Sequence, residues 1–333
     1  MSSNSSQTSP QQQAMLDHLQ HVQQVDERIF LGIQIAGGQI LLPILVLTII
    51  FSRKVTRHPV FINFCVSWIF SSIIYSMLVY KGRSNDDDLS LNPTYDACLI
   101  QAALINGVQA LTVSSSLALV VHLWIILRFC AKSKNDPSLF GKHKSEMLYT
   151  FSILGIPFAV FVAFTVYSVV AGSAMAINEA TEQQIPNSNL SVPGVFYCVI
   201  LFNSNLSASI TPGLGLVRAT YIFSAVISLV TMCFEGLVAH LIFRQRVELR
   251  RISRGWLMAF LRVVLFSVYR ILSICLNLAI ILYPDELLLV GIAKNNLFNG
   301  VIDYVQAAIP LVAFLIFATE KASMFKYNIV HRF

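Results

Sequence analysis

Long runs of apolar, mostly uncharged residues recur along this chain, separated by shorter polar or basic segments. A helix needs about 18 or more such residues to cross the hydrocarbon core of a bilayer. The pattern predicts seven membrane-spanning helices, at Ile29–Phe51, Val60–Tyr80, Ala97–Phe129, Met147–Ala171, Leu216–Phe243, Trp256–Tyr283 and Gly300–Phe317. The expected fold class is therefore an all-α membrane protein, a seven-transmembrane helix bundle.

The third of these segments is unusually polar for a membrane span. Its polar residues are Gln101, Asn106, Gln109, Thr112, Ser114, Ser115 and Ser116. A helix in lipid tolerates this much polarity only where it faces protein or a water-filled cavity. The segment from Cys98 to Cys130 is thus expected to form the central helix of the bundle.

The overall composition agrees with a membrane protein. Apolar residues make up 56% of the chain and charged residues 12%, about half the charged share of a soluble domain. We expect residues 1–28 to form a disordered extracellular tail, 29–317 the seven-helix bundle and 318–333 a short cytoplasmic amphipathic tail helix. The net charge of +6 does not predict nucleic-acid binding, because the basic residues are scattered over separate connections.

The placement of lysine and arginine predicts an orientation. Most of these residues lie in the 1–2, 3–4 and 5–6 connections and in the C-terminal tail, which by the positive-inside rule are cytoplasmic. The N-terminus is then outside. The three glycosylation sequons, at Asn4, Asn189 and Asn205, all fall on segments assigned to the outer side.

Two cysteines also fall on the outer side. Cys98 lies at the top of the third span and Cys198 in the 4–5 connection, in a compartment that favours disulfides. A bridge between them is expected to tie that connection to the third span. The alternative is two unpaired thiols.

This architecture resembles that of the G-protein-coupled receptors, which share the outside N-terminus and the two cysteines. The acid–Arg–Tyr motif of the large rhodopsin-like family is absent, since Arg128 follows Trp124-Ile125-Ile126-Leu127, and Ile309 replaces the asparagine before Pro310. The segments Thr56–Phe64 and Val108–Leu111 are similar to those of receptor-like families of basidiomycete fungi. The resemblance implies a fungal plasma-membrane receptor that signals through a heterotrimeric G protein.

Charged residues inside the predicted spans are functional candidates, because an unpaired charge in hydrocarbon is costly. Glu235 in the fifth span and Arg262 in the sixth lie at compatible depth, which predicts an ion pair. The pair would act as a latch that opposes movement of the sixth span. A static structural pair, or Arg262 extending to the lipid headgroups, is the alternative.

Arg270 lies near the middle of the sixth span, with no acidic residue of another span at its depth. We expect a ligand pocket beside the polar side of the third span. Its candidate walls are Arg270, Gln109, Asn106, Tyr269, Gln306 and Asp303. A purely structural arginine that holds spans together is the alternative.

A set of arginines is expected to face the cytoplasm at the ends of the third and fifth spans. It comprises Arg128, Arg244, Arg246, Arg250, Arg251 and Arg254. These residues would attract anionic lipid, dock a G protein, or do both.

The sequence shows no zinc pattern, phosphate loop or nucleophile elbow, and its seventh span has no lysine for a retinal Schiff base. We therefore expect no enzyme, no metal and no cofactor. The expected partners are membrane lipids, a heterotrimeric G protein and an unidentified small-molecule or lipid ligand. The alternative function is a seven-span transporter or lipid exporter, although the internal repeats common in transporters are not seen.

Overall fold

The structure is a computed structural model of the 333-residue chain. It describes residues 25, 28–51, 58–80, 95–133, 143–181, 191–193, 198–200, 212–244, 264, 265, 267–269, 271, 272, 275 and 304–316. The asparagines of the three sequons, the tail helix expected at 318–333 and the arginines at 246–254 lie outside the described residues. The predictions for these segments stay predictions.

The described part of the chain is almost entirely helical. The first helix, Arg28–Phe51, contains a π-helical segment, η1 (Ile35–Leu41), followed by α2 (Leu42–Phe51). The other helices are α3 (Pro59–Tyr75), α4 (Tyr95–Ser133), α5 (His143–Thr181), α6 (Pro212–Arg244) and an unlabelled helix, Tyr304–Ile316. The described residues between 264 and 275 are also helical.

Among the described residues, four helical segments are long and apolar enough to cross a membrane: Arg28–Phe51, Asp96–Arg128, Phe151–Val170 and Ile222–Ile242. The chain is thus a multi-pass membrane protein. Two shorter apolar helices, Pro59–Tyr75 and Tyr304–Ile316, coincide with the second and seventh predicted spans. In the second, α3 is interrupted at Ser76, with φ −88° and ψ 4°, and residues 77–80 are again helical, so the helical segment extends to Tyr80, the predicted end of this span.

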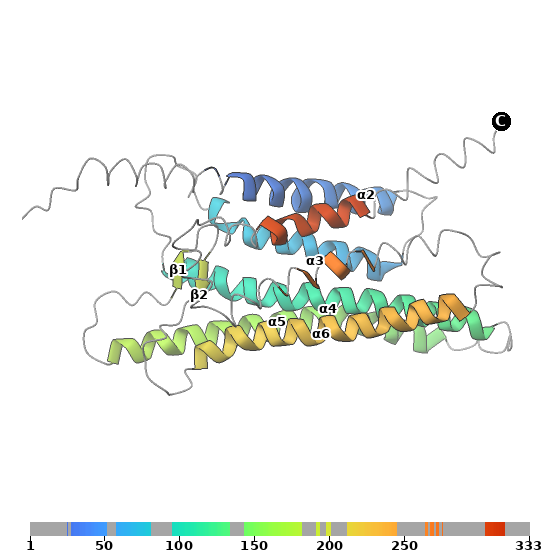
Figure 1. Ribbon diagram of the computed structural model, residues 1–333. Coiled ribbons are helices and arrows are strands. Elements are labelled where there is room, and N and C mark those ends of the chain that lie inside the picture. The colour runs from blue at the N-terminus through green and yellow to red at the C-terminus, as the bar shows by residue number, and fades with distance from the viewer. Residues whose placement is uncertain are drawn as a thin grey trace, which may run out of the picture.

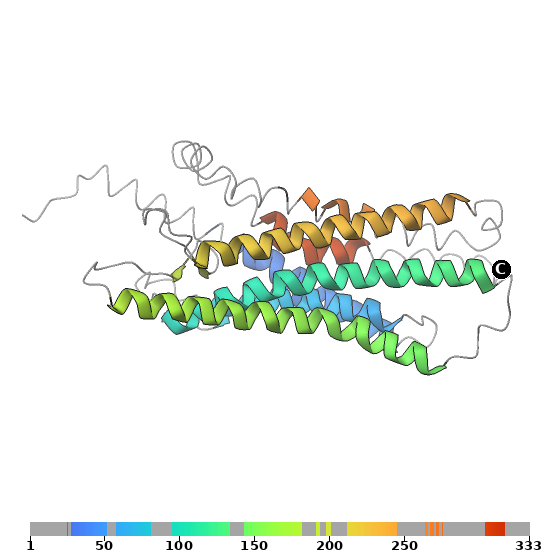
Figure 2. The ribbon, with the colours of Figure 1, turned by 90° about the horizontal axis from the view of Figure 1, so that it is seen from below.

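Helix α4 is the centre of the bundle, as its polarity predicts. It packs against α3, α5 and α6, and the two ribbon views show these helices running alongside it (Figures 1 and 2). Within the apolar span of α4, 56% of the residues are buried, against 11% in α5 and 22% in α6. Helices α5 and α6 therefore present broad apolar faces outward, as lipid contact requires.

Small residues allow the first helix to approach its neighbours closely. A Cβ atom added at Gly37 would lie 2.7 Å from the backbone nitrogen of Leu311, and one at Gly38 would overlap the side chain of Ser72. Without these side chains, the backbones of the first helix, α3 and the Tyr304–Ile316 helix pack against one another. The short α3 is thereby held inside the bundle.

A small hairpin covers one end of α4 (Figure 1). Strand β1 (Ser191–Pro193) pairs antiparallel with β2 (Cys198–Ile200), with Val192 opposite Val199. The sequence pattern predicts only a polar connection from Gly172 to Gly213, so the hairpin and the extension of α5 to Thr181 are both missed. The predicted disulfide between Cys98 and Cys198 is present, with Cα atoms 5.2 Å apart.

Candidate ligand site between the helices

A polar junction centred on Tyr75 joins three helices inside the bundle. Gln306, on the Tyr304–Ile316 helix, donates a hydrogen bond from Nε2 to the Tyr75 hydroxyl at 2.7 Å. Gln109, on α4, donates to the same oxygen at 3.4 Å. Tyr75 is the final residue of α3 and is only 3% exposed. Gln109 and Gln306, two of the predicted pocket residues, therefore meet at Tyr75, which was not among the predicted residues.

Tyr269 joins this region from the 264–275 segment. Its hydroxyl donates to the backbone oxygen of Val305 at 2.6 Å, one residue before Gln306. A phenol in an apolar interior needs such a partner, because leaving the hydroxyl unsatisfied is costly. The bond therefore places Tyr269 against the helix that carries Gln306.

Asn106 points to a different neighbour. Its Nδ2 donates to the hydroxyl of Ser168 on α5 at 3.4 Å, and that hydroxyl donates to the backbone oxygen of Phe164 at 2.7 Å. The structure does not bring Asn106 to the Tyr75 junction. Arg270 and Asp303, the charged residues predicted for the pocket, lie outside the described residues.

Three side-chain hydroxyls of α4 donate hydrogen bonds to backbone oxygens of the same helix. Thr112 donates to the backbone oxygen of Gln109 at 3.0 Å, and Ser116 donates to that of Thr112 at 2.8 Å. Ser115 does the same to Leu111 at 2.6 Å. Such local bonds are available to any Ser or Thr in a helix, so the polarity of these three residues does not by itself require a ligand.

Glu235 is buried in α6 and accepts a hydrogen bond from the hydroxyl of Ser267. This contact connects α6 with the 264–275 segment, the same two spans that the predicted ion pair would join. The predicted partner, Arg262, lies outside the described residues, so the latch stays a prediction. Ser267 is missed by sequence reasoning, because a serine in an apolar run has no distinguishing pattern.

An aromatic cluster lies between the start of α3, the far half of α4 and the start of α5. The rings of His58 and His122 are 3.7 Å apart between centroids, and Tyr149 stacks on His122 at 6.4 Å. His122 is buried, and neither of its ring nitrogens has a hydrogen-bond partner among the described residues. Burial lowers the pKa of His58, which lies outside the predicted spans, below 6.5. His122 is thus a packed histidine.

Arg128 is exposed near the end of α4, on the same helical side as Trp124. Its guanidinium carbon lies 5.1 Å from the centroid of the Trp124 ring, a distance at which a cation is attracted to an indole. Trp124 in turn packs edge-on against Phe234 of α6, with ring centroids 5.6 Å apart. Helix α6 ends at Arg244, whose side chain is outside the described part.

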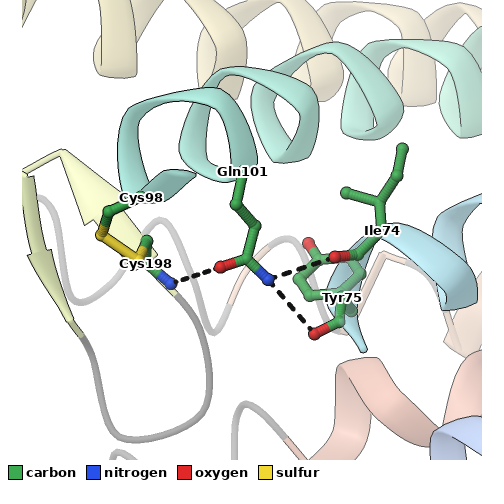
Figure 3. Close-up of a disulfide and its surroundings, with 5 residues drawn as sticks. All are labelled: Ile74, Tyr75, Cys98, Gln101 and Cys198. Carbon is green, nitrogen blue, oxygen red and sulfur yellow. Dashed lines mark hydrogen bonds between the residues drawn. A yellow bond between two sulfur atoms is a disulfide. The ribbon is translucent and has the colours of Figure 1, made fainter. Parts of the chain in front are cut away.

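A fully buried glutamine connects the hairpin to the Tyr75 junction (Figure 3). Gln101 accepts a hydrogen bond from the backbone N–H of Cys198 at 3.0 Å and donates to the backbone oxygen of Ile74 at 3.2 Å. A second, longer contact reaches the backbone oxygen of Tyr75 at 3.5 Å. Sequence reasoning includes Gln101 in the polar side of the third span but assigns it no role.

The site as described is made of neutral hydrogen-bonding groups. Among the residues that the structure describes, no group of three or more His, Cys, Asp or Glu side chains is placed to hold a metal ion. Phenol and amide groups can bind a ligand by hydrogen bonds and can orient it. No protein-family model matches the chain, and no curated protein matches its sequence.

Proposed function

We propose that the chain is a seven-helix receptor of G-protein-coupled type, in the plasma membrane of a fungal cell. The observation that carries the proposal is the junction at Tyr75, where amides from two other helices meet inside a membrane bundle. In an apolar interior such groups are costly unless they satisfy one another or a ligand. A ligand that forms hydrogen bonds at this junction would contact three helices at once.

The disulfide supports the proposed orientation. Cystine persists in oxidising compartments, and Cys98–Cys198 lies at the hairpin end of the bundle. That end is then extracellular, which agrees with the distribution of lysine and arginine. The proposal includes seven crossings, an outside N-terminus, glycans at Asn4, Asn189 and Asn205, and a cytoplasmic C-terminus.

The proposed mechanism is a shift between two existing arrangements of the sixth helix. A small molecule or lipid that binds one arrangement better than the other changes their populations by its difference in affinity. Tyr269 and Ser267 are the described contacts of that helix with its neighbours, through Val305 and Glu235. Movement there would alter the cytoplasmic surface near Arg128, where the G protein is proposed to dock.

The decisive experiment measures nucleotide exchange on a G protein. The purified chain is placed in phospholipid nanodiscs with a heterotrimeric G protein, and binding of a non-hydrolysable GTP analogue is followed over time. We expect severalfold faster exchange than with empty nanodiscs, and GTP should dissociate a pre-formed complex. Arg128→Glu should weaken this effect while leaving the fold intact, because it reverses an exposed charge.

A transport assay on the same preparation addresses the rival function. Vesicles containing the chain and a fluorescent phospholipid are tested for movement of that lipid between leaflets or out of the vesicle, with no G protein present. Lipid movement without any effect on nucleotide exchange would refute the receptor proposal in favour of an exporter. In a cell-based ligand screen, Arg270→Gln should abolish the response at normal surface expression.

A further inference from the structure

The regular part of α3 is interrupted at Ser76, in the interior of the bundle, and residues 77–80 are again helical. Ser76 breaks the helical conformation, although its N–H still bonds to the backbone oxygen of Ser72 at 3.1 Å. Within this segment the backbone oxygen of Ile74 accepts from the N–H of Ser76, only two residues further on, whereas a regular α-helix bonds residues four apart. In lipid or in a protein core, a carbonyl that its own helix satisfies poorly costs free energy unless another group also bonds to it.

Gln101 on α4 supplies an additional hydrogen bond to this interrupted part of α3. Its Nε2 bonds to the backbone oxygens of Ile74 and Tyr75, and its Oε1 accepts from the N–H of Cys198 (Figure 3). The side chain is 0% exposed, so water does not replace these bonds if they are lost. One amide thus satisfies the end of α3 and the start of β2 together.

Both ends of this bridge are placed by other parts of the fold. Cys198 is linked covalently to Cys98, one helical turn before Gln101 on α4, so the hairpin is held against the helix that carries the amide. At the other end, the hydroxyl of Tyr75 receives the two amides of the proposed ligand site. The backbone is therefore tied to the hairpin at Ile74, the residue before Tyr75, and the side chain of Tyr75 is tied to the site.

We propose that Gln101 is a positioning residue that couples the disulfide-bonded hairpin to Tyr75. It sets the end of α3 so that Gln109 and Gln306 reach the Tyr75 hydroxyl. A change in the hairpin, such as loss of the disulfide or contact with an extracellular ligand, is transmitted to the site through this amide. The consequence for ligand recognition rests on the proposed function, whereas the coupling itself does not.

The test is hydrogen–deuterium exchange of the peptide that covers residues 76–80, measured on the full chain in nanodiscs. Gln101→Met keeps the length of the side chain and removes its hydrogen bonds. Losing a bond that holds the end of α3 should accelerate local exchange roughly tenfold. Asn106→Leu is the matched control, since it removes a polar side chain of α4 that faces α5, and it should leave residues 76–80 unchanged.

The coupling is tested by removing the disulfide in both backgrounds. With Gln101 present, Cys98→Ala together with Cys198→Ala should raise exchange at residues 76–80 severalfold. With Gln101→Met, the same change should add less than about twofold, because the connection is already broken. An equal increase in both backgrounds would overturn the proposal, as would unchanged exchange in Gln101→Met.

A milder variant guards against misfolding. Gln101→Asn shortens the side chain by one methylene, so its amide cannot reach both Cys198 and the end of α3, and exchange at 76–80 should again rise. None of these measurements uses a G protein. Failure of the receptor proposal would leave the exchange results standing, and unchanged exchange would refute the coupling even in a functional receptor.

Discussion

Replacing Tyr75 by phenylalanine removes the oxygen on which the proposed site converges. The ring remains, so the apolar contacts of Tyr75 in the core around Phe30, Ile105 and Leu111 are retained. What is lost is one acceptor for the amides of Gln306 and Gln109. The variant therefore isolates the hydrogen bonds from the packing.

The two bonds should contribute unequally. The contact from Gln306 is 2.7 Å, near the optimum, whereas that from Gln109 is 3.4 Å and close to the limit. Hydrogen bonds between membrane helices are worth on average about 0.6 kcal/mol and at most about 1.7 kcal/mol in double-mutant cycles. We expect a coupling of about 1 kcal/mol or more for Tyr75 with Gln306, and less than about 0.5 kcal/mol for Tyr75 with Gln109.

The assay is a pair of double-mutant cycles on the free energy of unfolding. Tyr75→Phe is combined with Gln306→Met in one cycle and with Gln109→Met in the other, and unfolding is followed by circular dichroism in a titration of mixed micelles with a denaturing detergent. The single variant Tyr75→Phe should lose about 1.5 kcal/mol. The matched control is Tyr167→Phe, at an exposed tyrosine on the lipid side of α5, and it should change stability very little.

Equal couplings in the two cycles would refute the reasoning from distance. A coupling near zero for Tyr75 with Gln306 would mean that the shorter bond does not hold the Tyr304–Ile316 helix to α3. The second result would also remove the geometric basis of the proposed site. The control separates these outcomes from a general effect of losing a phenol.

Three further predictions concern packing, the disulfide and pH. Gly107→Ala should cost about 1–3 kcal/mol, because its Cβ would overlap the side chain of a residue on α5, whereas Gly155→Ala, with no atom within 4 Å of its Cβ, should be neutral in a thermal unfolding assay. Replacing Cys98 and Cys198 by serine should cost about 2–4 kcal/mol, measured by the same detergent titration. This loss is smaller than the loop-closure entropy expected for a fully unfolded loop of the same length. The reason is that α4 and α5 stay helical when they separate in lipid, so the chain between the two cysteines is not fully unfolded. Since burial lowers the pKa of His58 below 6.5, the unfolded chain binds this proton more readily, and stability should fall as the pH drops below 6.5. His58→Asn, which retains a helix cap, should reduce this dependence in melting curves between pH 7.5 and 5.5.

The membrane character of the chain and the central place of α4 could be predicted from the sequence. Both follow from local quantities: the length of apolar runs and the number of polar residues within one run. The pairing of Cys98 with Cys198 was also predictable, since the charge pattern leaves only these two cysteines on the outer side. Such features depend on each segment's preference for lipid or water, and they depend little on which other segments pack against it.

Only the tertiary structure decided which polar groups meet. Asn106 and Gln109 are three residues apart on α4, yet one bonds to α5 and the other to Tyr75. The sequence does not single out Tyr75 or distinguish Gln101 from the other polar residues of its helix, because a tyrosine that ends an apolar run and a glutamine in a polar helix resemble many others. Their roles arise from the break at Ser76 and from close approach of the backbones at Gly37 and Gly38. Hydrogen bonds between helices depend on rotations and crossing points that the pattern of one helix does not contain, and so the site could not be assembled from the sequence alone.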